Sequence, residues 1–181
     1  MKDFKNSVAL IVLVVMLSAC GNTDSTSESK VEGQSSSTSV DSSKAISFVD
    51  TQEGKPLEID HAFFDTPAAK EFLTTGKNPY VNDEDAIASG KKIFGLYSCT
   101  QCHGPTAQGQ VGPGLVGPTF KYPKNATNKG MFETIWNGTN GGMGGKGKGI
   151  MTPTDGMTPD EVLKVIAWIR TQGSEGLTGN E

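Results

Sequence analysis

The 181-residue sequence predicts an all-α fold of short helices joined by long glycine-rich loops. Two observations support this prediction. Four segments between residues 66 and 173 place apolar residues at helical spacing and carry residues typical of helix starts or ends. The stretches 104–120 and 139–156 are dense in glycine, and the first is also rich in proline, so we expect loops there.

The chain begins with a segment that is typical of a secretory signal. Lys2 and Lys5 precede an unbroken apolar run over residues 8–17, which is shorter than a membrane-spanning helix requires. We therefore interpret residues 1–19 as a signal peptide that takes no part in the fold. The sequence Leu-Ser-Ala-Cys at its end resembles a bacterial lipobox, which predicts that Cys20 is lipidated.

Residues 20–45 are predicted to form a disordered tether behind the lipidated cysteine. Ser and Thr dominate this segment, and it has too few apolar residues to offset the entropy of ordering it. The folded domain is expected over residues 46–181. Acyl chains on Cys20 would hold this domain on the periplasmic side of a membrane, without indicating which membrane.

The first elements of the domain are weakly marked strands and a short helix. Residues 45–60 show a weak strand-like alternation. A short helix is expected between Thr66, a capping residue, and Gly76, a helix stop, with Pro67 in its first turn.

Two further helices are expected in the middle of the chain. The first covers residues 82–103, with Asn82 as its cap and three acidic residues in its first turn. Gly90 in its interior costs about 1 kcal/mol relative to Ala, so we expect a close helix crossing at this position. The second is short and covers residues 128–138.

The last helix is the clearest element of the sequence. Thr158 and Glu161 have the spacing of a capping box, apolar residues recur at helical spacing, and Gly173 ends the helix. Hydrophobic residues make up 35% of the chain, and several short helices alone would enclose a thin core. We therefore expect a further apolar component in the middle of the domain.

Cys99, Cys102 and His103 form a C-x-x-C-H motif, the pattern of c-type haem attachment. Thiols at this spacing can bond to the two vinyl groups along one edge of a haem. The adjacent histidine then lies under the iron as its proximal ligand. One covalently bound haem c would also supply the apolar surface that the thin core lacks.

Zinc binding and dithiol redox chemistry fit the motif less well than haem attachment does. A structural zinc site needs four ligands, and the remaining histidine and cysteine of the chain are His61 and the lipidated Cys20. A thioredoxin-like redox pair needs a βαβ context, and the pattern of the chain provides none.

The charge of the chain argues against one class of partner. The formal net charge is −4 at pH 7, whereas a nucleic-acid-binding surface would be basic. The acidic balance fits docking to a basic protein, or solubility alone. Lys124 and Lys129 are interpreted as solvated surface charges.

A methionine opposite the histidine would raise the potential of the iron, as in electron-transfer cytochromes. Four methionines follow the motif. Met131 and Met157 lie in or next to predicted helices and are interpreted as packing residues. Met143 and Met151 lie in the second glycine-rich loop, where the backbone can approach a haem face, and both are candidates.

With these residues, the chain resembles the class I cytochromes c, and in particular the cytochrome c-L family. The matching stretches are FLTTGKNPYV, GKKIFGLYSCTQCHG, GQVGPGL, YPKNATNKGMFETIWNGTNGGMG and MTPDEVLKVIAWIR. The resemblance implies the class I cytochrome c fold, with short helices around one haem. It also implies thioether bonds at Cys99 and Cys102, and His103 as the proximal iron ligand.

The resemblance suggests two further roles. Pro113 matches the proline whose carbonyl accepts the N–H of the proximal histidine, a bond that makes His103 a stronger donor. Met143, in NGTNGGMG, matches the distal methionine of the family. The extra residues GKGKGI place Met151 in a Met-x-Pro pattern before the last helix, so Met143 is preferred and Met151 is the alternative.

The resemblance implies a periplasmic carrier of single electrons that is not an enzyme. Members of the family accept electrons from PQQ-dependent methanol dehydrogenases, of calcium or lanthanide type, during methanol oxidation in methylotrophs. A second cytochrome or an oxidase would be the next acceptor. The alternatives are a general membrane-tethered cytochrome that feeds a terminal oxidase and, with less support, a haem peroxidase or sensor.

Overall fold

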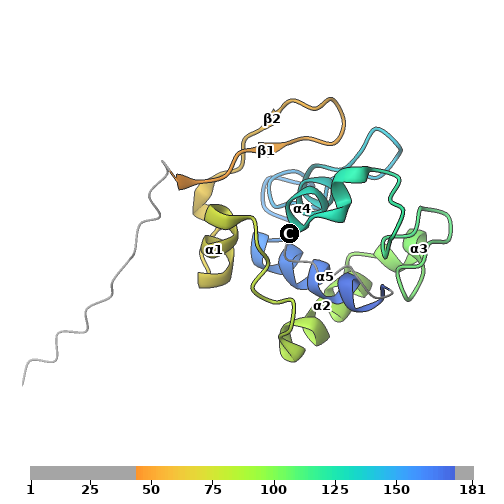
Figure 1. The fold of residues 1–181 in the computed structure, drawn as a ribbon. Helices are drawn as coiled ribbons and strands as arrows, with labels where there is room; N and C mark the ends of the chain where they lie inside the picture. The colour runs from red at the N-terminus through yellow and green to blue at the C-terminus, as the bar shows by residue number, and fades with distance from the viewer. Residues whose placement is uncertain (1–43, 174–181) are drawn as a thin grey trace, which may run out of the picture. The chain divides into compact units, whose positions relative to one another are not determined.

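Helices dominate the regular structure of residues 44–173, the part of the chain that the computed structural model describes (Figure 1). The elements are β1 (Phe48–Val49), β2 (Pro56–Leu57), η2 (His61–Phe63), α1 (Pro67–Thr75), α2 (Glu84–Leu96), α3 (Cys99–His103), η3 (Pro123–Ala126), α4 (Asn128–Asn137) and α5 (Pro159–Thr171). The predicted all-α class is confirmed. The predicted signal peptide and Cys20 lie outside the described residues, as does nearly all of the predicted tether.

The predicted start signals of two helices, α1 and α5, are present in the structure, and α4 begins with a cap that the sequence analysis did not name. The Thr66 side chain accepts a hydrogen bond from Ala69 N at the start of α1, and Gly76 ends this helix in the left-handed conformation. Thr158 and Glu161 form the reciprocal capping box of α5. Thr127 caps α4 in the same way, because its side chain accepts from a backbone N–H three residues later.

The helix predicted over residues 82–103 is divided into two. Its cap is Asp83, whose carboxylate accepts from Ala86 N at 2.9 Å, and not Asn82. The carboxylate adds a negative charge at the positive end of the helix dipole, which an amide cannot do. The helix ends at Leu96, and Ser98 takes a left-handed conformation (φ 58°, ψ 23°). The chain therefore changes direction before α3 begins.

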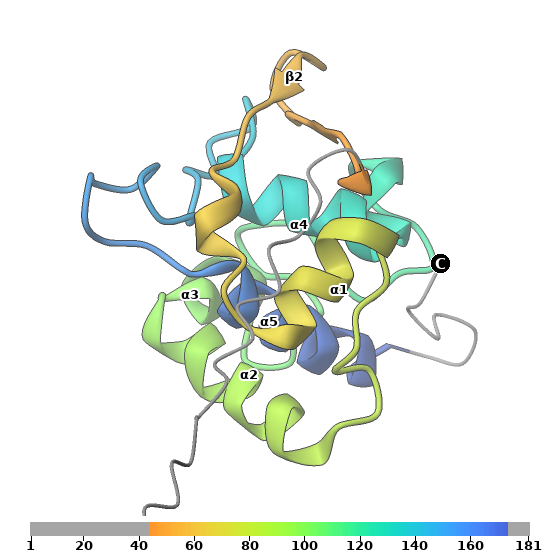
Figure 2. The same cartoon turned by 90° about the vertical axis from the view of Figure 1, so that its left-hand side faces the viewer.

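The close crossing predicted at Gly90 brings α2 against α5 (Figure 2). A Cβ on Gly90 would lie 2.0 Å from the carbonyl oxygen of Lys164, so only glycine permits this approach. Phe94 and Trp168 pack beside the crossing, with ring centroids 4.6 Å apart. Because α3 follows α2 closely in the chain and contacts it, the packing of α2 on α5 positions α3.

The N-terminal segment adds aromatic side chains to the core. β1 and β2 pair antiparallel, with Phe48 opposite Leu57. Phe48 contacts Phe132 of α4 at a centroid distance of 5.4 Å, and Phe132 contacts Phe72 of α1 at 4.8 Å. The core is therefore larger than the short helices alone suggested. No helix within residues 44–173 is long and apolar enough to cross a membrane.

The interpretation of Lys124 and Lys129 as solvated charges is wrong. Both pair with Glu133 of α4, at 2.7 and 2.5 Å, and the Glu133 side chain is 1% exposed. Glu133 also accepts from the backbone N–H of Val49, while Lys124 donates to the Val49 carbonyl. The lysines are held because they neutralise a buried carboxylate, and this cluster fastens the β1–β2 hairpin to α4.

Candidate haem-binding site

The C-x-x-C-H motif forms the single turn of α3. Residues three and four apart lie on the same side of a helical turn, so Cys99 is brought next to Cys102 and His103. Cys99 is half-buried, Cys102 is exposed, and the His103 side chain is buried, with the residue 7% exposed. The turn thus presents two sulfur atoms and one imidazole to the same region.

The His103 ring is held by the loop that follows α3. Its Nδ1 lies 2.8 Å from the carbonyl oxygen of Pro113. Because a carbonyl only accepts hydrogen bonds, Nδ1 carries the hydrogen and Nε2 keeps its lone pair for a metal. A Cβ on Gly112 would lie 3.1 Å from Cε1 of His103, so this glycine allows the loop to pack on the ring.

A cavity of about 480 Å³ opens beside α3 and is lined by the predicted residues Cys99, Cys102, His103, Pro113 and Met143, but not by the alternative ligand Met151. A narrower, mainly apolar recess adjoins it and shares Cys99, His103 and Met143 with it. The hydrophobic wall of this recess comes from Phe94, Leu115, Met131, Ile135, Val165 and Ile169. The cavity has the size and the largely apolar lining typical of a cofactor site.

The four candidate methionines lie in different environments. Met143 lines both the cavity and the recess, and its carbonyl accepts from Thr139 N at 2.8 Å in a tight loop. Met131 is 2% exposed and also lines the recess, so it packs in the core and forms part of the wall of the recess. Met151 is 44% exposed and lines neither space, and buried Met157 lines neither.

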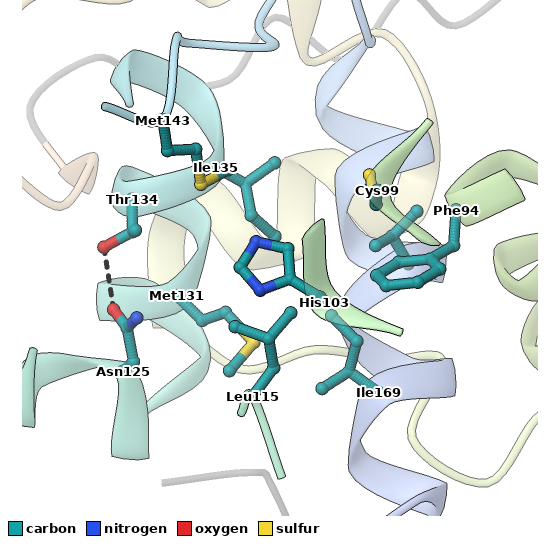
Figure 3. Close-up of a pocket in the computed structure, with 11 residues that line it drawn as sticks. Phe94, Cys99, His103, Leu115, Asn125, Met131, Thr134, Ile135, Met143 and Ile169 are labelled. Carbon is teal, nitrogen blue, oxygen red and sulfur yellow. Dashed lines mark hydrogen bonds between the residues drawn. The ribbon is translucent and has the colours of Figure 1, made fainter. Parts of the chain in front are cut away.

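Figure 3 shows the arrangement of these side chains around the imidazole. In this view Met143 and Met131 lie to one side of His103, and Cys99 and Phe94 lie to the other. The structure therefore brings Met143 to the same cavity as the C-x-x-C-H motif and leaves Met151 at the surface.

Comparisons with known proteins agree with this geometry. The cytochrome c family model matches residues 87–173. Over 128 residues, the chain is 41% identical to cytochrome c-L of Methylorubrum extorquens, a match that covers 69% of this chain. Among solved structures, cytochrome cL of Methylophaga aminisulfidivorans superimposes with a TM-score of 0.60 at 37% identity, covering 70% of this chain and 79% of that one.

The chain belongs to the cytochrome c family. Its relatives are of the c-L type, and they include cytochrome cL of Hyphomicrobium denitrificans, with a TM-score of 0.59 at 41% identity, covering 70% of this chain and 73% of that one. The match spans 61% of the length of the Methylorubrum relative. The predicted class I cytochrome c fold is confirmed, and with it a covalently bound haem c.

The residues of this cytochrome fit a c-type haem better than zinc or a redox dithiol. No group of three or more His, Cys, Asp or Glu converges within residues 44–173, so a four-ligand zinc site lacks its donors there. Burial raises the pKa of the Cys99 thiol, which disfavours the thiolate that a redox dithiol requires. Cys99 and Cys102 are not joined in a disulfide.

Several polar residues of the cavity were not identified from the sequence. Asn125 and Thr134 both line it, and Thr134 donates to the side chain of Asn125 at 2.7 Å. Lys121 and Tyr122 lie on its edge. Most of them lie in the stretch from Tyr122 to Gly144 that carried the family resemblance. The spacing of residues in this stretch does not distinguish those that line the cavity from those at the surface.

Proposed function

We propose that this cytochrome is a periplasmic, membrane-tethered carrier that accepts single electrons from a PQQ-dependent methanol dehydrogenase. A second cytochrome c or an oxidase would then oxidise it. The observation that carries the proposal is the 41% identity to a cytochrome c-L, together with a solved relative from a marine methylotrophic bacterium.

The proposed iron ligands are His103 and Met143, and Cys99 and Cys102 are the proposed thioether positions. Two observations support Met143 over Met151: Met143 lines the cavity with His103, and Met151 is exposed outside it. A haem with a protein ligand on each face stores and passes one electron without an open position for substrate. This suits a carrier, and it disfavours a peroxidase or a gas sensor.

Cys102 indicates where electrons would enter and leave. It is exposed, and Val111, which lines the same cavity, is 85% exposed. The haem edge bonded at Cys102 would therefore lie at the surface, next to an apolar side chain that a partner can cover. We propose this edge as the transfer point.

The charge of the folded domain changes the expectation for docking. Residues 44–173 contain equal numbers of basic and acidic residues, so the net charge of −4 arises from the rest of the chain. A uniformly acidic docking face is therefore not supported for this domain. Local charges around the cavity, and not the net charge, would guide a partner.

Stopped-flow reduction tests the proposed donor. Purified ferric holoprotein is mixed with a PQQ methanol dehydrogenase and methanol, and haem reduction is followed by absorbance. We expect rapid reduction that depends on methanol, and slower reduction of a class I cytochrome c of another type. No reduction at micromolar dehydrogenase would reject the donor. Reoxidation by a terminal oxidase in that case would favour the general carrier.

Cell fractionation tests the proposed lipid anchor. The full-length chain should be found in the membrane fraction and should incorporate labelled fatty acid. Cys20→Ala should remove the label and release a haem-containing protein into the soluble periplasmic fraction. Labelling that persists in Cys20→Ala would contradict lipidation at this residue.

A further inference from the structure

Three polar side chains converge on Gly141 at the edge of the haem cavity. A Cβ built on Gly141 would lie 2.8 Å from Tyr122 Oη, 3.3 Å from Lys121 Nζ and 3.5 Å from Thr139 Oγ1. All four residues line the cavity of about 480 Å³. The three polar atoms therefore gather beside Gly141 on one part of the cavity wall, which forms a pocket of hydrogen-bond donors.

The charges around this pocket have one sign. Lys121 and Lys146 are the charged residues that line the cavity, and no Asp or Glu of the described chain lines it. Within residues 44–173, Lys121 forms no ion pair, and its Nζ lies 5.9 Å from the centre of the Tyr122 ring. The Thr139 hydroxyl accepts from Gly141 N at 3.2 Å, which leaves its own hydrogen free to be donated. A cationic pocket of donors favours a carboxylate.

We propose that Lys121, Tyr122 and Thr139 bind one of the two propionate groups of the haem where these side chains gather beside Gly141. The haem is the nearest source of an anion, because it is covalently attached in this family and its carboxylates must leave the apolar recess. The inference rests on haem c at Cys99 and Cys102, and it does not depend on the identity of the electron donor.

The position of the pocket suggests what such binding does. Gly141 precedes Met143 by two residues in the loop that is closed by the Gly138–Gly144 bridge. A carboxylate held at Gly141 would fasten this loop over the haem. The positive charge of Lys121 would disfavour the ferric form and so raise the midpoint potential. Lys121 is thus a positioning residue.

Substitutions of Lys121 test the proposal on the isolated holoprotein with small redox mediators, so that no dehydrogenase is needed. Lys121→Met should move the ferric–ferrous equilibrium several-fold toward the ferric form, and Lys121→Arg should restore the wild-type value. Lys92→Met is the matched control, because Lys92 is exposed and lines neither the cavity nor the recess. Equal shifts in Lys121→Met and Lys92→Met would overturn the proposal.

Gly141→Ala provides a second test that leaves every charge in place. Its Cβ would meet the ends of flexible side chains, so the fold should persist while Tyr122 Oη and Lys121 Nζ are displaced. The redox-difference infrared spectrum reports the propionate carboxylate stretches directly. We expect these bands to shift in Gly141→Ala and Lys121→Met and to be unchanged in Lys92→Met. Unchanged bands in the first two variants would overturn the assignment.

Discussion

Nδ1 of His103 lies 2.8 Å from the carbonyl oxygen of Pro113, ten residues further along the chain. This contact sets which ring nitrogen keeps a lone pair, and so which one can bind iron. It also makes the orientation of the imidazole depend on the position of the glycine-rich loop that contains Pro113. The loop can reach the ring because Gly112 has no side chain.

Gly112→Ala should disturb this contact. The new Cβ would lie 3.2 Å from Nδ1 and 3.3 Å from the Cys102 carbonyl oxygen, so the loop must move away from the ring. A longer hydrogen bond makes His103 a weaker donor, which stabilises the ferric form less and raises the midpoint potential. Overpacking of this kind also costs about 1–3 kcal/mol of stability. Redox titration and denaturant unfolding of the holoprotein measure both effects, and a lower midpoint potential would contradict the proposed effect on His103.

Substitution of single methionines should identify the distal ligand. Met143→Leu should abolish the near-infrared charge-transfer band of a methionine–ferric haem and lower the potential. Met151→Leu should leave both unchanged, because Met151 is 44% exposed and outside the cavity. Met131→Leu should keep the band and cost less than about 1.5 kcal/mol, as a swap of similar volume. Loss of the band in Met151→Leu alone would reverse the assignment.

Two glycines of the same helix should respond in opposite ways to alanine. Gly90→Ala places a Cβ 2.0 Å from the Lys164 carbonyl oxygen and must separate α2 from α5. Gly95→Ala meets no atom of the described chain within 4 Å and should stabilise the helix by up to about 1 kcal/mol. Thermal unfolding of the two holoproteins provides the comparison. Equal stabilisation by both substitutions would show that the crossing is not close.

Asp160 should make the stability of the fold depend on pH in the acid range. Burial alone raises the pKa of this carboxyl, but hydrogen bonds from Lys164, Tyr80 and Thr66 outweigh it and lower the pKa below the usual 3.8. A lowered pKa contributes stability that is present above pH 3.8 and is lost as the pH falls toward the folded-state value.

Denaturant unfolding at pH 7 and at pH 3 tests this contribution. Asp160→Asn should be less stable than the wild type at pH 7, and the difference should shrink at pH 3. Glu71→Gln, at an exposed position of α1, is the matched control and should change little at either pH. An undiminished difference at pH 3 would mean that the charge of Asp160 does not stabilise the fold.

Local signals in the sequence predicted most of the helices correctly. Thr66, Thr158 and Glu161 act within one helical turn of their partners, so their roles can be derived from spacing. The cap at Asp83 and the division of α2 from α3 were missed. The cap depends on a small difference between the neighbouring polar residues Asn82 and Asp83. The division depends on the left-handed conformation of Ser98, which the spacing of apolar residues does not reveal.

The sequence by itself determined the chemistry of the attachment motif, because Cys99, Cys102 and His103 lie within one turn and need no distant residue to be brought together. Only the tertiary structure decided which methionine shares the cavity with His103. It also decided that Lys124 and Lys129 neutralise a buried carboxylate and that Lys121 and Tyr122 meet at Gly141. The physical reason is that such contacts depend on how loops and helices pack, and glycine-rich loops allow many paths between the same endpoints.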